Sequence, residues 1–335
     1  FTLKQSMGVV AAIVPWNFPL PIAAWKAAPA LAAGNAVVLK PASISPLTAL
    51  RMAELATEAG LPPGVLQVLP GSGSVVGDAL VTHPKVRKVS FTGSTEVGKH
   101  IMRLAAGNLT RVSLELGGKS PNIVFADADW EKAADNSPMS VFANTGQDCC
   151  ARSRMFVERP IFEGFVERFI AATRRLVVGD PALEATQLGP MASAAQRDVV
   201  EGFLADARSR GTQIACGGGR PGGRGYFMEP AVLLGVGTQD RCWREEIFGP
   251  VVAVVPFDDE AAMLHEVNDS PYGLSGSVWT RDLARALRVS RVVESGVLSV
   301  YCHNSVHVEA PFGGFKTSGL GRDLGMAAKI GRAHV

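Results

Sequence analysis

The sequence has few cysteines, an almost neutral charge balance and no unbroken apolar run long enough to cross a membrane. Its 335 residues include five cysteines, which follow neither a metal-ligand spacing nor an even disulfide framework. Lys and Arg total 33 against 31 Asp and Glu, and the basic residues are scattered. The apolar stretch from Ala27 to Leu39 is interrupted by Pro29, Gly34 and Asn35. These absences argue against a nucleic-acid partner, a membrane partner and a metal site, and they favour a reduced, cytoplasmic protein.

The first third of the chain alternates short apolar runs with amphipathic stretches. Strands are expected over 8–14, 36–40, 65–69 and 88–91, and a helix over 46–59. A strand, a crossover helix and a second strand in succession are typical of a parallel doubly wound sheet, which binds ligands at the carboxyl ends of its strands. We therefore predict an α/β fold with a Rossmann-like doubly wound sheet.

Two glycine-rich turns compete for a phosphate-binding role. The turn over 71–77 is one residue longer than the usual dinucleotide fingerprint. The turn over 91–98 places Ser94 or Thr95 near the start of a helix, where free N–H groups and the helix dipole suit a pyrophosphate. Both turns also have a purely structural explanation, because tight turns need glycine.

A candidate nucleophile lies in the run Phe142-Ala143-Asn144-Thr145-Gly146-Gln147-Asp148-Cys149-Cys150-Ala151. Glu115 stands 34 residues before Cys149, in the run Leu114-Glu115-Leu116-Gly117-Gly118-Lys119. A thiol and a carboxylate supply the nucleophile and the base that covalent catalysis at a carbonyl requires. Most cysteines are small buried hydrophobes, so the thiol pair alone does not decide the function.

Seven motifs occur in a fixed order along the chain, and together they resemble the aldehyde dehydrogenase superfamily. The motifs are Pro15-Trp16-Asn17-Phe18-Pro19, Leu39-Lys40-Pro41-Ala42, Phe91-Thr92-Gly93-Ser94-Thr95, Leu114-Glu115-Leu116-Gly117-Gly118-Lys119, Gly146-Gln147-Asp148-Cys149, Glu245-Glu246-Ile247-Phe248-Gly249-Pro250 and Pro311-Phe312-Gly313-Gly314-Phe315-Lys316. The resemblance extends from about residue 1 to about residue 328. It implies a non-acylating, NAD(P)-dependent enzyme with a second α/β domain that carries the catalytic thiol.

The resemblance assigns three catalytic residues. Cys149 corresponds to the nucleophile, and Asn17, together with the backbone N–H of Cys149, corresponds to the oxyanion donors. Glu115 resembles the general base that activates water. The implied reaction oxidises an aldehyde to a carboxylic acid through a cysteine thiohemiacetal and a thioester.

The resemblance also implies the cofactor contacts, with NAD or NADP as the cofactor. Lys40 corresponds to a residue that reaches the adenosine ribose, and Ser94 to the pyrophosphate seat, so the turn over 91–98 outranks the one over 71–77. Glu246 and Phe248 resemble the pair that holds the nicotinamide ribose and ring. The remaining expected contacts are Trp16, Ser43, Gly93, Gly98 and Leu116. Many NAD-preferring relatives have glutamate at the position of Ser43, so we expect NADP to be accepted, with NAD remaining an open alternative.

The expected domains are a partial dinucleotide-binding domain over 1–117, a catalytic domain over 118–318 and a C-terminal segment over 319–335. The resemblance implies a long portion before Phe1, so the chain is expected to be a fragment of a homo-oligomeric parent, a dimer or a tetramer. It also implies a different ending, so we expect a non-native tail over 330–335.

The second domain is expected to open with a strand over 120–125. A helix should follow, starting near Asp127 or Asp129. Pro138 is expected to kink that helix or to begin a new one with Ser137 as its cap.

Two alternatives to the dehydrogenase remain open. A thiol esterase or hydrolase could use Cys149 and Glu115 without a cofactor, and the chain could be an inactive fragment. The aldehyde itself is not determined by the sequence, although the resemblance favours the group that takes amino- or semialdehydes.

Overall fold

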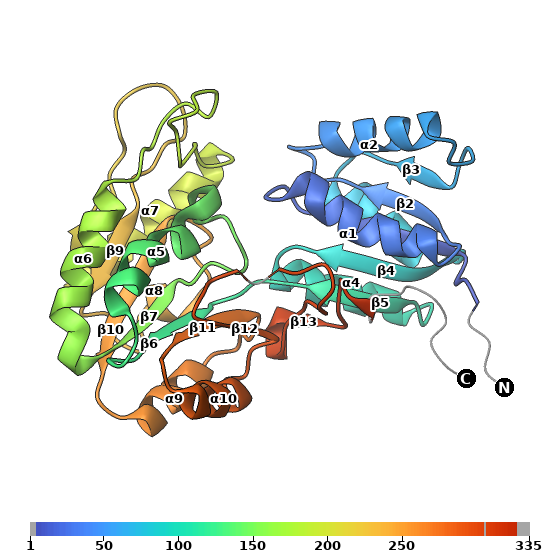
Figure 1. Ribbon diagram of the computed structural model, residues 1–335. Helices are drawn as coiled ribbons and strands as arrows, with labels where there is room; N and C mark the ends of the chain where they lie inside the picture. Colours follow the sequence, from blue (N-terminus) through green and yellow to red (C-terminus); the bar gives the residue numbers. More distant parts are fainter. Residues whose placement is uncertain (1–4, 305, 327–335) are drawn as a thin grey trace. The chain divides into compact units, whose positions relative to one another are not determined.

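The structure is a computed structural model that describes residues 5–304 and 306–326. These residues form two compact units (Figure 1). The first unit contains the described residues up to Gly117 together with 306–326, and the second unit contains 118–304. The expected tail over 330–335 lies outside the described residues.

The segment 306–318 belongs to the first unit, whereas we expected it at the end of the catalytic domain. Strand β13 (Gly319–Leu320) pairs antiparallel with β5 (Arg111–Glu115), and Trp25 packs edge-on against Phe312 with ring centroids 5.8 Å apart. The chain thus returns to the first unit before β13. The sequence motif at 311–316 marked this segment without indicating which unit it joins.

A six-stranded sheet with the order β13-β5-β4-β1-β2-β3 forms the first unit. Its other strands are β1 (Val9–Ile13), β2 (Ala36–Lys40), β3 (Leu66–Val68) and β4 (Val86–Thr92). All pairings except that of β13 are parallel. The order of β1 to β5 reverses between β1 and β4, which is the topological switch point of a Rossmann-like doubly wound sheet. The predicted fold class is confirmed.

Helices cover both faces of this sheet, so the residues of β1 are buried on both sides. Val10 and Ala12 pack with Ile22 of α1 (Pro19–Ala32), on the face that α2 (Leu47–Glu58) also covers. Ala11 packs on the opposite face with Ile101 of α4 (Thr95–Ala106). The short helices η1 (Gly73–Gly77) and α3 (Asp78–Thr82) precede β4.

The second unit is a seven-stranded sheet with the order β12-β11-β6-β7-β10-β9-β8. Its strands are β6 (Pro121–Val124), β7 (Arg154–Glu158), β8 (Gln213–Cys216), β9 (Ala231–Leu234), β10 (Val251–Phe257), β11 (Ser275–Trp279) and β12 (Val297–Val300). Every pairing is parallel except that of β8 with β9. This sheet is the second α/β domain that the resemblance implied.

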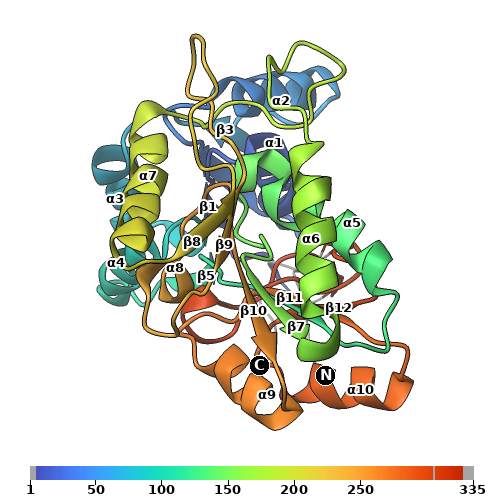
Figure 2. The same cartoon turned by 90° about the vertical axis from the view of Figure 1, so that its left-hand side faces the viewer.

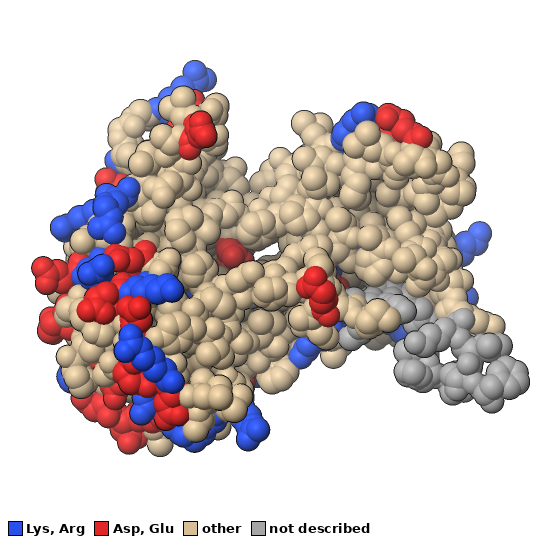
Figure 3. Space-filling model, in the orientation of Figure 1, with Lys and Arg blue, Asp and Glu red and all other residues tan. Residues whose placement is uncertain are grey.

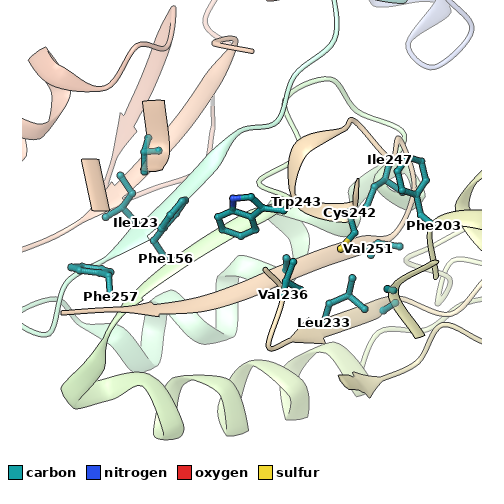
Figure 4. Packing of buried hydrophobic residues seen from close by; sticks show 14 of the residues in the cluster. Ile123, Phe156, Phe203, Leu233, Val236, Cys242, Trp243, Ile247, Val251 and Phe257 are labelled. Atoms are coloured by element: carbon teal, nitrogen blue, oxygen red, sulfur yellow. The ribbon is translucent and has the colours of Figure 1, made fainter. Parts of the chain in front are cut away.

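Two helical layers also sandwich the second sheet, and Figure 2 shows α6 and α7 on opposite sides of β9 and β10. One layer holds α5 (Trp130–Phe142) and α6 (Phe162–Arg174), and the other holds α7 (Ala194–Ser209), α8 (Arg241–Arg244), α9 (Glu260–Asn268) and α10 (Leu283–Val292). The core between the sheet and the second layer includes Trp243, whose ring lies edge-on to that of Phe156 with centroids 5.2 Å apart (Figure 4). The remaining short turns are η2 (Ala143–Gly146), η3 (Arg159–Ile161) and η4 (Lys316–Ser318).

Helix α5 corrects one expectation from the sequence. Its start is as predicted, since Asp129 caps it by accepting a hydrogen bond from the Lys132 backbone N–H at 3.2 Å. The helix then continues through Pro138, and Ser137 is no cap; its Oγ accepts a hydrogen bond from Asn122 at 2.9 Å. Burial of the helix face on both sides of Pro138 compensates for the backbone hydrogen bond that proline cannot donate.

Charged side chains are unevenly distributed over the face shown in Figure 3. Acidic and basic atoms intermingle over the helical side of the second unit and are sparse over the first. One such pair joins α6 to α5, with Arg168 2.7 Å from Asp135. Exposed pairs of this kind contribute little to stability. Among the described residues, no helix has both the length and the apolar character needed to cross a bilayer.

Candidate active site

The predicted site residues of the first unit follow the carboxyl ends of its parallel strands. Trp16 and Asn17 come after β1, Lys40 ends β2, and Glu115 ends β5. Gly93 and Ser94 come after β4, so they and the residues after β1 flank the switch point. This is the edge at which doubly wound sheets bind ligands.

The start of α4 combines a serine cap with two sterically constrained glycines. Ser94 caps the helix, its Oγ accepting a hydrogen bond from the Val97 N–H at 3.4 Å. A Cβ at Gly93 would collide with the Phe91 ring, and one at Gly98 would stand 2.6 Å from the Leu116 side chain. Steric crowding therefore explains both glycines. The helix start also presents the positive end of its dipole, which suits an anion.

Lys40 and Ser43 lie beside the turn over 71–77. The Lys40 ammonium is buried and donates to the Pro41 carbonyl at 3.0 Å, and burial lowers its pKa. Ser43 is exposed, and its hydroxyl donates to the Gly71 carbonyl at 3.1 Å. Gly77 packs against the Lys40 side chain, where an added Cβ would lie 3.8 Å from Cδ. The turn over 71–77 thus supports the lysine.

Glu115 is a buried carboxyl group with little polar support. Its exposed fraction is 4%, and neither oxygen has a hydrogen-bond partner of ordinary geometry among the described residues. The backbone of Asp323 still stabilises the charged form weakly. Burial, followed by the Asp323 carboxylate, raises the pKa of Glu115 well above its usual range. A buried, poorly satisfied carboxyl with a raised pKa is typical of a catalytic acid or base.

The surroundings of Glu115 explain part of the motif over 311–316. A Cβ at Gly313 would stand 2.7 Å from Glu115 Oε1, so glycine there leaves room for the carboxyl group. Nearby, the fully buried Lys26 donates to Ser90 Oγ at 3.0 Å and to Asp323 Oδ2 at 2.8 Å. The Lys26 charge opposes the effect of Asp323 on Glu115.

In the second unit, the loop before Cys149 has an unusual backbone. Asn144, Thr145 and Gly146 are consecutive residues in the left-handed region, with φ of 53°, 56° and 68°. Gln147 holds this loop, because its side chain donates to the Asn144 carbonyl at 3.0 Å and accepts from the Ala192 N–H at 2.8 Å. Non-glycine residues in this region carry strain, which concentrates at functional sites.

Cys149 is half-buried, and its immediate neighbours perturb its thiol. Hydrogen bonding with Cys150, then burial and the charge of Asp148, raises the pKa of the Cys149 thiol well above its usual range. Burial likewise raises the pKa of Asp148, against the hydrogen bond that its carboxylate accepts from the Cys150 N–H at 2.9 Å. Thiolate formation therefore requires a base or a change in these surroundings.

Two glycines bring separate motifs against the thiol loop. A Cβ at Gly118 would collide with the Cys149 carbonyl, and one at Gly146 would collide with the Gly249 carbonyl. Glu246 Oε1 accepts from the Gly118 N–H at 3.0 Å, and burial raises the Glu246 pKa to about 7. A small cavity is lined by Gly118, Gly146, Asp148, Ala151, Ser153, Glu246, Ile247, Phe248, Gly249 and Val251.

Lys119 is a functional candidate that the sequence interpretation passed over. It is 2% exposed, and its Nζ has no hydrogen-bond partner among the described residues. Burial, reinforced by the charge of Arg154 and opposed by those of Cys242 and Glu246, lowers its pKa to about 7. The lysine stood inside a quoted motif, but only burial distinguishes it from an ordinary surface lysine.

The structure thus divides the predicted residues into two groups. The first unit holds Trp16, Asn17, Lys40, Ser43, Gly93, Ser94, Gly98, Glu115 and Leu116, and the second unit holds Cys149, Glu246 and Phe248. Phe248 has a left-handed φ of 54°, and its carbonyl accepts from Gln196 at 3.0 Å. The sequence interpretation did not single out Asp148 or the pair Lys26–Asp323. The position of Asp148 next to Cys149 could have indicated the first of these.

Comparison with known proteins identifies what the chain is similar to. The sequence model of the aldehyde dehydrogenase family matches residues 1–330. A phenylacetaldehyde dehydrogenase from Pseudomonas fluorescens is 48% identical over 329 residues, covering 98% of this chain and 66% of that protein. A cytosolic aldehyde dehydrogenase from Mus musculus is 45% identical over 97% of this chain and 65% of its own length.

Solved structures agree with the sequence relatives. A betaine aldehyde dehydrogenase from Staphylococcus aureus in complex with NAD+ matches with a TM-score of 0.95 at 42% identity, over 98% of this chain and 66% of that one. An indole-3-acetaldehyde dehydrogenase mutant from P. syringae, in complex with NAD+ and IAA, matches with a TM-score of 0.97 at 45% identity, over 98% and 68%. The chain spans slightly less than two thirds of the length of the sequence relatives named above.

Proposed function

The chain belongs to the aldehyde dehydrogenase family, and on that premise we propose that it oxidises an aldehyde to a carboxylic acid with NAD or NADP. The observation that carries the proposal is the pair of unusual groups at the predicted catalytic positions. Cys149 follows a left-handed loop, and Glu115 is a buried carboxyl without ordinary hydrogen bonds. A nucleophile and a base are the two groups that the reaction needs from the protein.

The residues suggest how the cofactor would be held. Ser94 at the start of α4 suits the pyrophosphate, Lys40 the adenosine ribose, and Glu246 with Phe248 the nicotinamide riboside. Gly93 and Gly98 let the helix start pack closely against Phe91 and Leu116. The donor set therefore fits a dinucleotide. When bound, the nicotinamide accepts the hydride that leaves the aldehyde carbon.

In the proposed reaction, the Cys149 thiol gives its proton to solvent water, Sγ bonds to the aldehyde carbon, and the carbonyl oxygen gains the negative charge. Asn17 and the Cys149 backbone N–H donate hydrogen bonds to that oxygen, where one donor typically contributes about 10²–10³ in rate. Loss of hydride leaves a thioester on Sγ. Glu115 then takes a proton from water, the water oxygen adds to the carbon, and the C–S bond breaks to release the acid and the thiol.

Ser43 supports the proposal that NADP is accepted alongside NAD. The side chain is exposed and neutral, and it makes its hydrogen bond to the Gly71 carbonyl. Ser43→Glu adds a negative charge, and two unit charges about 4 Å apart in water repel by roughly 1 kcal/mol, so kcat/KM for NADP should fall about fivefold. The value for NAD should stay within about threefold. Ser43→Ala is the matched control, because it removes the hydrogen bond without adding charge.

The test of the activity is the reduction of NAD or NADP, followed by absorbance. The aldehydes are phenylacetaldehyde, indole-3-acetaldehyde and betaine aldehyde, which the names of the relatives supply. Reduction should occur with at least one of them and fall by more than about 10³-fold in Cys149→Ala. Hydrolysis of activated esters without any NAD(P) reduction would contradict the dehydrogenase and support the cofactor-independent hydrolase.

The remaining proposals concern the surroundings of the protein. We propose a small-molecule aldehyde as the substrate, a cytoplasmic location and a homo-oligomeric assembly, either a dimer or a tetramer. Size-exclusion chromatography with light scattering tests the last of these, and a monomer at micromolar concentration would contradict it.

A further inference from the structure

The thiol loop holds a cluster of three metal-binding side chains that the sequence interpretation did not recognise. One carboxylate oxygen of Asp148, Cys149 Sγ and Cys150 Sγ all lie within 4.8 Å of one another. Consecutive residues follow none of the usual ligand spacings, so the pattern is invisible in the sequence. Among the described residues, no other group of three His, Cys, Asp or Glu side chains converges in this way.

The backbone explains why three consecutive side chains converge. The Asp148 carbonyl accepts a hydrogen bond from the Ala151 N–H at 3.1 Å, which closes a tight turn. Inside that turn, the Asp148 carboxylate accepts from the Cys150 N–H at 2.9 Å. The turn therefore keeps the carboxylate close to the two cysteines, and this partial preorganisation lowers the cost of binding.

The separation of the ligand atoms suits a thiophilic cation. Two thiolates at about 2.3 Å from a tetrahedral zinc stand roughly 3.8 Å apart, so a rotation of the side chains brings these groups to bonding distance. Asp148 and Cys149 are half-buried and Cys150 is buried, which leaves the cluster partly open for entry and for a further ligand. Thiols select Zn²⁺ and softer cations over Mg²⁺ and Ca²⁺, which prefer oxygen.

We propose that Asp148, Cys149 and Cys150 form a binding site for a thiophilic divalent cation, with Zn²⁺ as the representative ligand. Two S–H bonds are replaced by two S–Zn bonds, two protons are released, and no group is oxidised or reduced. The cation would occupy the sulfur that the reaction needs, so binding would inhibit the enzyme reversibly. This consequence rests on the proposed function, whereas the binding itself does not.

Charges around the cluster act in both directions. The carboxyl groups of Asp148 and Glu246 attract a cation, and both influence Cys149. Arg152 opposes binding: it is buried, its guanidinium donates to the Cys150 carbonyl and to Ser277 Oγ, and the Cys149 and Cys150 charges act on it. The balance favours a cation that forms strong bonds to sulfur over one held by charge alone.

Protection of Cys149 from alkylation tests the site directly. The intact protein is treated with iodoacetamide at a series of buffered free Zn²⁺ concentrations, and the modification of each cysteine is followed by peptide mass spectrometry. Zn²⁺ should slow the modification of Cys149, and a chelator should restore it. In Cys150→Ser and in Asp148→Asn, the half-protecting concentration should rise by at least about tenfold.

Cys302→Ser is the matched control, because Cys302 is an exposed cysteine outside the cluster, and protection should be unchanged. Titration with Cd²⁺ adds a spectroscopic readout, since the thiolate-to-cadmium absorption should lose about half its amplitude in Cys150→Ser. Thermal melts of the variants show whether each is folded. The paired use of Cys150→Ser and Asp148→Asn keeps the test decisive if one of them fails to fold.

Two results would overturn the proposal. Alkylation of Cys149 that is insensitive to Zn²⁺ would exclude the site, and equal protection in the parent and in both variants would reduce it to a lone thiol. The assay needs neither aldehyde nor NAD(P). Protection without NAD(P) reduction would therefore support the site and count against the proposed function, whereas NAD(P) reduction without protection would do the reverse.

Discussion

The two units are both parallel α/β sheets, yet their candidate site residues lie at opposite ends of the strands. In the first unit, Lys40 ends β2 and Glu115 ends β5. In the second unit, Lys119 comes just before β6 and Cys149 lies before β7. Among the candidate residues, only those of the first unit thus follow the carboxyl-end rule for ligand sites. Candidate reactive residues can thus lie at either end of a parallel sheet, depending on which of its loops contain them.

The two units also differ in the hydrogen bonding of a buried lysine. Lys26 of the first unit is fully buried and donates to Ser90 and Asp323. Lys119 of the second unit is equally inaccessible, but its Nζ has no partner among the described residues, and its pKa falls to about 7. Paired buried charges are typical of structural networks, whereas an unsatisfied buried group with a strongly shifted pKa is typical of function.

Lys26→Met should have the largest effect on stability. It leaves the Asp323 carboxylate buried without its cation, which typically costs about 3–5 kcal/mol of unfolding free energy. Urea denaturation measures the change. Lys99→Met is the control, because Lys99 pairs with Glu96 on the surface and should contribute nothing measurable. If both variants lowered the unfolding free energy by the same small amount, the buried pair would be no more stabilising than the exposed one.

Lys119→Met should act in the opposite direction and raise the stability near neutral pH. The folded pKa of about 7 lies below the unfolded value near 10.5, so between these values the unfolded state binds a proton that the folded state lacks. The stability of the parent should therefore rise with pH across that window. The variant should gain at most about 5 kcal/mol below pH 7, and nothing above about pH 10.5.

Urea denaturation at pH 7, 8.5 and 10 measures this difference, with the exposed Lys132→Met as the control. A Lys119→Met variant that loses several kcal/mol at every pH would place Lys119 with Lys26 as a satisfied structural lysine. The comparison between the two units would then fail.

Tyr301→Phe should have the smallest effect and sets the scale for an ordinary hydrogen bond in the second unit. Tyr301 has a left-handed φ of 62°, its ring packs on Trp279 at 5.3 Å, and its hydroxyl accepts from the Asp129 N–H at 2.9 Å. Loss of the hydroxyl should cost about 0.5–1.5 kcal/mol by thermal or urea denaturation. Tyr226→Phe, on an exposed ring, should be neutral, and equal losses in both variants would contradict the assignment.

The sequence predicted the first sheet well, because its buried strands are short apolar runs separated by clear turns. It placed the start of α5 correctly, since Asp129 is a standard cap, but it gave Pro138 too much weight, because packing of both helix halves outweighs one missing hydrogen bond. It assigned 306–318 to the wrong unit, since a chain reversal leaves no local signal.

The candidate site was predictable to the extent that motifs mark it. The resemblance proposed Cys149 and Glu115 as catalytic residues but gave no information on their surroundings. The unsatisfied Lys119 arises from burial, and the convergence of Asp148 with two thiols arises from a tight turn; both depend on the three-dimensional fold. Gly313 was part of a motif, but only the fold shows why glycine is needed there, which is to leave room for Glu115.

The central claim is that Cys149 forms the covalent intermediate and that Glu115 governs its hydrolysis. Rapid mixing of Glu115→Gln with an accepted aldehyde and NAD(P) tests it most directly, with intact-mass analysis of the quenched protein. We expect a stoichiometric burst of reduced cofactor, an acyl group on Cys149, and steady-state turnover about 10²–10⁴-fold slower than in the parent. A variant that turns over at the parent rate without a burst, or an acyl group on another residue, would contradict it.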